Sequence, residues 1–123
     1  MSYSGFSVSP EASSWIIQKL QEAESDPALA GLIPGLYFFL GEEWRDEHDQ
    51  LVESIQCPFF DICWNTKENA IAEGYMEIEM LGVKLIALPN VLERLQGKQL
   101  VLDTIEVKYP TPDNKRQLLK AVE

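Results

Sequence analysis

Two cysteines are the residues of this sequence whose chemistry is most readily tested. Cys57 and Cys63 are its only cysteines, six positions apart. Thiolates are preferred ligands of zinc and iron–sulfur clusters, but closed sites usually take four ligands, often from close Cys-x-x-Cys pairs. On one extended strand the two thiols would lie roughly 20 Å apart, and a disulfide would need a sharp turn starting at Pro58. We expect both to be buried core thiols and no cofactor. A metal (zinc or iron–sulfur) or redox role for them, in a site within one chain or shared across a dimer, is the alternative.

The acidic stretch from Glu42 to Glu53 contains the only histidine, His48. Carboxylates together with an imidazole can bind a divalent cation. A hard-cation loop, however, needs oxygen ligands at set positions and a glycine at its bend, and this stretch lacks that pattern. We therefore expect it to be a solvated loop or the start of a helix.

No complete catalytic set is present in the sequence. It has no phosphate-binding glycine loop, no Gly-x-Ser-x-Gly and no His-Glu-x-x-His motif. We therefore assign no catalytic or cofactor-binding residue and expect a protein that is not an enzyme. A group of aromatic residues favours a packed core, with a ligand pocket as the alternative. The members of this group are Tyr37, Phe38, Phe39, Phe59, Phe60 and Trp64.

The elements that must position these residues follow from apolar spacing and turn residues. Ser9 as N-cap and Pro10 as the first helical residue predict a helix that Asp26-Pro27 ends. Its buried face is predicted to hold Ala12, Ile16, Leu20 and Ala23. Further predictions are strands over 36–40, 59–64, 75–79, 83–88 and 100–107, a short helix over 89–95 and a last helical turn or two over 114–122. The order predicts one α+β domain over residues 1–123, with a small, mostly antiparallel or mixed β-sheet and helices on one side.

Charge narrows the range of partners. Ten basic residues against twenty acidic ones give a net charge of -10. A phosphate backbone or an anionic membrane would repel such a chain, so we expect no nucleic-acid and no membrane partner. A basic protein partner or a homodimer is favoured. The sequence begins with no secretory signal, which makes the cytoplasm the expected location. The one basic cluster, Lys115, Arg116 and Lys120, is predicted to be a docking segment or a frayed tail.

One segment has a familiar order of residues. Gly82-Val83-Lys84 opens a strand that runs to Leu88-Pro89, and Leu95-Gln96-Gly97 leads into a strand that contains Asp103. This order resembles the HesB-like, or A-type iron–sulfur carrier, family, as does the opening Val8-Ser9-Pro10-Glu11-Ala12. The resemblance covers about half the chain and implies a HesB-like fold. Leu88 stands where that family has an aspartate.

The resemblance also implies cysteines at two places, and this sequence has none there. Gly41-Glu42-Glu43-Trp44 stands near the first place and Tyr109-Pro110-Thr111-Pro112 near the second. No cluster ligand is therefore carried over from the family. The leading hypothesis is a non-catalytic HesB-like scaffold that acts through protein–protein contacts. The alternatives are a metal or iron–sulfur carrier that uses Cys57 and Cys63 in a non-standard site, and a small-molecule binder with an aromatic-lined pocket.

Overall fold

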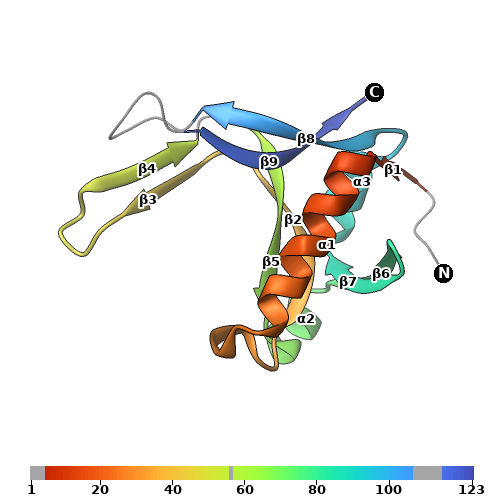
Figure 1. The fold of residues 1–123 in the computed structure, drawn as a ribbon. Coiled ribbons are helices and arrows are strands. Elements are labelled where there is room, and N and C mark those ends of the chain that lie inside the picture. The colour runs from red at the N-terminus through yellow and green to blue at the C-terminus, as the bar shows by residue number, and fades with distance from the viewer. Residues whose placement is uncertain (1–4, 56, 107–114) are drawn as a thin grey trace.

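A curled mixed sheet holds two helices on one of its faces, and a separate two-stranded arm projects from it (Figure 1). The computed structural model describes residues 5–55, 57–106 and 115–123. The elements in chain order are β1 (Ser7–Val8), α1 (Pro10–Glu24), the 3-10 turn η1 (Pro27–Leu29), β2 (Ile33–Phe39), β3 (Glu42–Arg45), β4 (Leu51–Ile55), β5 (Phe59–Asn65), α2 (Lys67–Ala72), β6 (Met76–Met80), β7 (Val83–Ala87), α3 (Pro89–Leu95), β8 (Gln99–Glu106) and β9 (Lys115–Val122).

The main sheet has the strand order β1-β8-β9-β5-β2-β7-β6. The pairs β1–β8 and β2–β7 are parallel, and the other pairs are antiparallel. Strands β3 and β4 form a second, two-stranded antiparallel sheet. The predicted α+β class with a mixed sheet is therefore confirmed. Among the described residues, no helix is both long and apolar enough to cross a membrane.

Helix α1 begins where the sequence predicts it. The Ser9 hydroxyl accepts the Ala12 N–H at 3.2 Å, Pro10 opens the first turn, and the helix ends just before Asp26-Pro27. Ala12 and Ile16 are fully buried, whereas Leu20 and Ala23 are only half-buried. The helix is thus confirmed, with a buried stripe narrower than its apolar spacing suggests.

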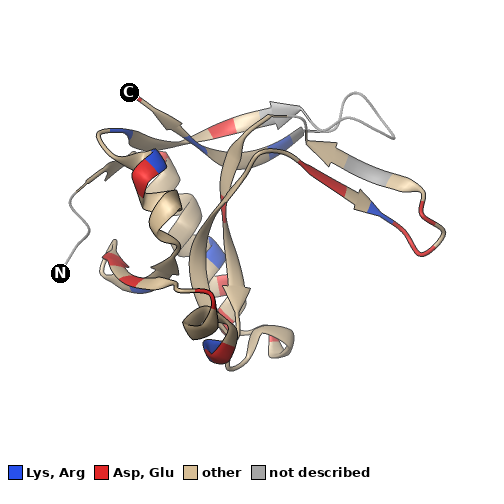
Figure 2. Cartoon of the chain, turned by 180° about the vertical axis from the view of Figure 1, so that it is seen from behind, with Lys and Arg blue, Asp and Glu red and all other residues tan. Residues whose placement is uncertain are grey.

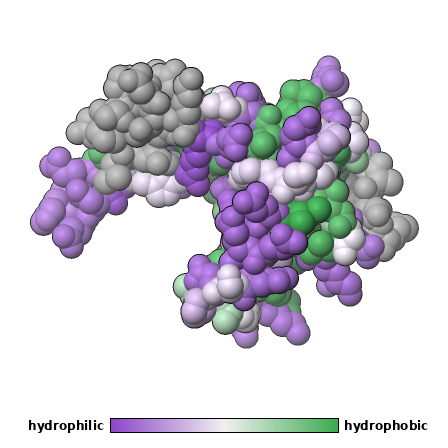
Figure 3. All heavy atoms as spheres, in the orientation of Figure 1, coloured by the Kyte–Doolittle hydropathy of each residue, from purple (hydrophilic) through white to green (hydrophobic). Residues whose placement is uncertain are grey.

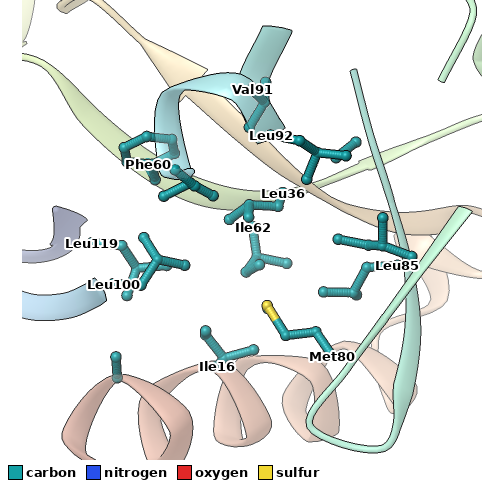
Figure 4. Packing of buried hydrophobic residues seen from close by; sticks show 14 residues of the cluster. Ile16, Leu36, Phe60, Ile62, Met80, Leu85, Val91, Leu92, Leu100 and Leu119 are labelled. Carbon is teal, nitrogen blue, oxygen red and sulfur yellow. The ribbon is translucent and has the colours of Figure 1, made fainter. Parts of the chain in front are cut away.

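The main core lies on the face of the sheet that α1 and α3 both cover (Figure 4). Leu36 from β2 and Ile62 from β5 meet Ile16 of α1 there, and Leu92 and Leu95 join them from α3. The predicted hairpin is present as β6 and β7, and the predicted short helix is α3. Gly97 follows that helix with φ +75°, a conformation that favours glycine after a helix end.

The acidic stretch after Gly41 is a β-hairpin, so the prediction of a loop or helix start was wrong. β3 and β4 pair from Glu42↔Ile55 to Arg45↔Leu51. A two-stranded ribbon leaves much of both faces in water, and strands of this kind accept charged side chains that a buried strand excludes. Charge alone therefore did not separate a loop from an exposed strand. We call residues 42–55 the arm.

The end of the chain is also a strand, and the predicted terminal helix over 114–122 was wrong. β9 pairs with β8 along its whole length, from Gln99↔Val122 to Glu106↔Lys115. Leu118 and Leu119 are adjacent and both fully buried, which a strand achieves by pointing them to opposite faces. The basic cluster Lys115, Arg116 and Lys120 is consequently part of the sheet and not a frayed tail. The predicted strand over 100–107 is β8, the penultimate one.

Helix α2 was absent from the predictions, although its start has a recognisable signal. The Thr66 hydroxyl accepts the Asn69 N–H at 3.2 Å, as an N-cap does. With six residues and only Ala70 buried, this helix lacks the apolar repeat on which the other helices were predicted. The segment Tyr109–Pro112, which the family resemblance singled out, lies outside the described residues.

Candidate functional site

The two cysteines do not gather a metal-binding group in the described part of the chain. Both thiols are free and half-buried. Cys63 lies within β5 opposite Gly35, whereas Cys57 precedes that strand. Among the described residues, no three His, Cys, Asp or Glu side chains are close enough to hold a metal ion. The structure thus shows no ligand that would complete a site at either cysteine.

The Cys63 thiol is held in its neutral form. Burial raises its pKa from 9.0 to about 11, and the neighbouring Asp61 carboxylate adds to the rise. Lys19 and Arg116 oppose the shift without cancelling it. The thiolate is the nucleophilic and metal-binding form of cysteine, so this environment disfavours both kinds of chemistry at neutral pH.

A buried carboxylate that the sequence analysis missed lies beside Cys63. Asp61 is 7% exposed and accepts a hydrogen bond from the Lys19 ammonium at 2.6 Å. Arg116 lies 4.0 Å from the second carboxylate oxygen. The sequence did carry a signal for this buried charge, namely a single acidic residue inside the apolar run Phe59–Trp64. Because its negative charge is paired with two cations, Asp61 serves to tie α1 and β9 to β5.

The arm is anchored at its root by a small apolar cluster on the other face of the sheet. Ile55, Phe59 and Leu118 are buried there, and Trp44 packs against them. The Arg116 guanidinium lies 5.4 Å from the centre of the Trp44 ring. The Trp44 side chain is half-buried and joins the arm to the body.

At the tip of the arm, Asp46 organises the turn. Its carboxylate accepts the N–H groups of His48 and Gln50 at 2.9 and 3.0 Å. The side chains of Glu47 and Asp49 are exposed. Figure 2 shows the acidic residues as red segments along the hairpin and its turn. The expected alternative of a cation site has no support here, because one carboxylate is committed to backbone donors and the others point into solvent.

The predicted aromatic group is divided between the two faces of β2 and β5. Phe38 and Phe60 face the main core, with ring centroids 4.9 Å apart. Phe39 and Phe59 are paired on the arm side, with ring centroids 5.0 Å apart. The period of two along a strand explains the division. All of the group except Tyr37 therefore pack in one of the two core clusters, and the Phe38–Phe60 pair also lines a hollow.

That hollow is a pocket of about 400 Å³. It opens where the ends of β2 and β5 meet β9 and the residues after α3. Phe38, Phe60, Leu40 and Ala121 supply apolar walls, and Cys57 and Pro58 complete one side. We call this hollow the basic pocket because its polar groups come from Arg94, Lys98 and Lys120.

A second hollow of about 400 Å³ adjoins the basic pocket. It shares Phe38, Leu40 and Arg94 with it, and Leu40, which the sequence placed in a buried strand, is 72% exposed. An exposed leucine between two hollows is a feature that binding surfaces commonly have. Phe38 and Phe60 were recognisable in the sequence as aromatic residues on strands. Arg94 and Lys98 were not, because they come from a separate segment and belong to no motif.

No protein-family model, curated protein or solved structure matches this chain. The arm and the basic pocket are therefore the two features of the chain on which a function can be proposed.

Proposed function

We propose that this protein is a non-catalytic domain of HesB-like fold that acts through protein–protein contacts, with the arm as the element that binds a basic protein surface. The observation that carries the proposal is the arm itself. It is a two-stranded sheet outside the main sheet, and its exposed surface is mostly polar (Figure 3).

The order of elements between residues 81 and 103 supports the HesB-like part of the proposal. The Gly-Val-Lys segment enters strand β7, Pro89 opens α3, and Gly97 leads into β8. These are the strand, short helix, bend and strand that the resemblance implies. Helix α1 likewise follows the similar opening segment at Ser9 and Pro10.

A two-stranded sheet that projects from the body has few contacts to stabilise it, so we interpret its presence as functional. An isolated hairpin is at best marginally stable in water, and its outer edges offer unpaired backbone groups to another chain. This arm is nevertheless stabilised at both ends. Its root packs against Phe59 and Leu118, and the Asp46 carboxylate accepts two backbone hydrogen bonds at its tip. An ordered, polar and accessible hairpin is suited to recognition by strand addition or by charge.

Charge indicates what kind of surface the arm would bind. Residues 42–55 contain six of the twenty acidic residues and only one of the ten basic ones, Arg45. Arg45 lies 3.3 Å from the Glu43 carboxylate and 4.0 Å from that of Asp49. The arm therefore presents a net negative surface, and a basic protein surface is its complement.

The proposal is tested by a matched pair of charge variants. One variant carries Glu47→Lys and Asp49→Asn at the tip, where Asn tolerates the positive φ of Asp49. The control carries Glu24→Lys and Glu93→Gln on the helices, which changes the net charge by the same amount. Partners are captured from cell extract, purified, and titrated against both variants at low and high salt.

We expect a basic partner whose binding the tip variant weakens by about tenfold or more, with a strong dependence on salt. The helix variant should bind as the unmodified protein does. A partner that binds both variants equally would overturn the proposal, and so would repeated captures that yield no saturable partner.

A further inference from the structure

The basic pocket gathers positive charge in a protein that is strongly acidic. Three of the ten basic residues line it, and the described lining includes none of the twenty acidic residues. Long-range repulsion of anions by the whole chain therefore gives way to local attraction in this hollow. Such a reversal points to a ligand that is itself negatively charged.

Two of the three cations are available to such a ligand. Lys120 lies 3.3 Å from the Asp103 carboxylate, a partially exposed pair. Arg94 and Lys98, by contrast, have no carboxylate within 4.0 Å in the described part of the chain. A bound anion would therefore pair with them without displacing a carboxylate of the described residues.

The aromatic wall positions the arginine. The Arg94 guanidinium carbon lies 4.2 Å from the centre of the Phe38 ring. This contact restricts the side chain before any ligand arrives, and so reduces the entropy that binding would otherwise remove. A guanidinium held in this way can donate two parallel N–H groups to a carboxylate, a geometry that a lysine lacks.

The remaining walls favour an apolar body on the ligand. Phe60, Leu40 and Ala121 line the pocket beside Phe38. The volume of about 400 Å³ lies within the range of small-molecule sites and suits one or two fused rings. We infer that the basic pocket binds a small aromatic carboxylate, with its ring against Phe38 and the exposed Leu40 and its carboxylate between Arg94 and Lys98.

This inference is independent of the arm and is tested with three probes of similar shape. 2-Naphthoate carries the proposed charge, 2-naphthamide is its neutral counterpart, and 2-naphthyl phosphate carries a different anion. Each is titrated into the full chain by calorimetry at low ionic strength, and the shifted amide resonances are mapped by NMR. We expect 2-naphthoate to bind with a dissociation constant of about 1 mM or tighter, as its size allows. The amide should bind at least about tenfold more weakly.

A pair of variants locates the site. Arg94→Gln with Lys98→Gln should weaken 2-naphthoate binding by about tenfold or more, because both changes remove charged donors. The control Lys84→Gln changes an exposed basic residue of β7 that does not line the pocket and should leave binding unchanged. Thermal melts show whether each variant is folded, and neither position is in the buried core.

Several results would overturn the inference. They are equal binding of the naphthamide, tighter binding of the naphthyl phosphate, full affinity in the Arg94→Gln, Lys98→Gln variant, and no saturable binding of 2-naphthoate up to about 10 mM. Resonance shifts confined to the arm would overturn it as well, since the pocket would then not be the site.

Discussion

The basic pocket and the arm belong to opposite faces of the same two strands. On β5, Phe60 points to the main core and the pocket, whereas its neighbour Phe59 points to the root of the arm. On β9, Leu119 and Leu118 are divided in the same way. One face continues into a large core that α1 and α3 close. The other carries a small cluster and a projecting ribbon.

The arm and the basic pocket also carry opposite charges, and these charges arise from different parts of the sequence. The arm obtains its negative charge from one continuous segment, so its character is local and visible in the sequence. The pocket obtains its positive charge from the end of α3, the turn that follows and β9, which only the folded chain brings together. We conclude that the charge of the acidic surface is set by one local segment, whereas that of the basic pocket depends on the main core being intact.

The largest expected effect on the free energy of unfolding comes from replacing two leucines, one on each face of β9. Leu118 and Leu119 are adjacent, identical and fully buried, but they face different clusters. We expect Leu119→Ala to lower the free energy of unfolding by about 3–5 kcal/mol, and Leu118→Ala by about 2–3 kcal/mol, because the smaller cluster can collapse into the space. Urea denaturation with a fixed slope measures both. A larger loss for Leu118→Ala would contradict the view that the main core dominates.

A second prediction concerns the thiol on the arm side. With the Cys63 pKa raised to about 11, the thiolate fraction at pH 8 is about a hundredfold below that of a thiol at 9.0. In a Cys57→Ser background, alkylation of Cys63 should therefore be about a hundredfold slower in the folded protein than in concentrated urea. Its rate should keep rising to about pH 11 and not level near pH 9.

A variant of Asp61 checks the cause of that shift. Because the Asp61 carboxylate helps to raise the Cys63 pKa, Asp61→Asn should lower that pKa and speed alkylation. Burial is the larger cause, so the acceleration should be partial. Rapid alkylation of folded Cys63 at pH 8 in the unmodified background would instead mark it as a reactive thiol and reopen its candidacy as a ligand.

The sequence predicted those parts of the fold that local rules determine. The Ser9 cap, the β6–β7 hairpin and the α3 helix each follow from neighbouring residues, and each is present. The arm and β9 were missed for different reasons. The arm is a strand pair whose apolar burial is confined to its root, so it lacks the apolar alternation of a half-buried strand. β9 is a strand because β8 pairs with it, a contact that charge and proline spacing do not reveal.

The candidate site was predictable only in part. Phe38 and Phe60 were recognised as aromatic residues on strands, and their opposition across β2 and β5 follows once the register is known. Arg94 and Lys98 had no signal, since an exposed basic residue near a helix end is ordinary. Their importance arises from the curl of the sheet, which brings β9 and the end of α3 to one hollow. That geometry depends on the packing of the whole core.

The smallest expected effect tests whether the arm is independent of the body. Asp46→Ala removes the acceptor for the His48 and Gln50 N–H groups, so hydrogen exchange at these two amides should rise by roughly fivefold, as the loss of a net 1 kcal/mol implies. The free energy of global unfolding should change by less than about 0.5 kcal/mol, because the tip has no buried contacts to the core. Glu47→Ala, at an exposed position on the same turn, is the control and should change neither. If Asp46→Ala destabilised the whole protein as strongly as Leu118→Ala does, the tip would be coupled to the core. The arm would then be a structural part of the fold and a poor candidate for a contact element that can adapt to a partner.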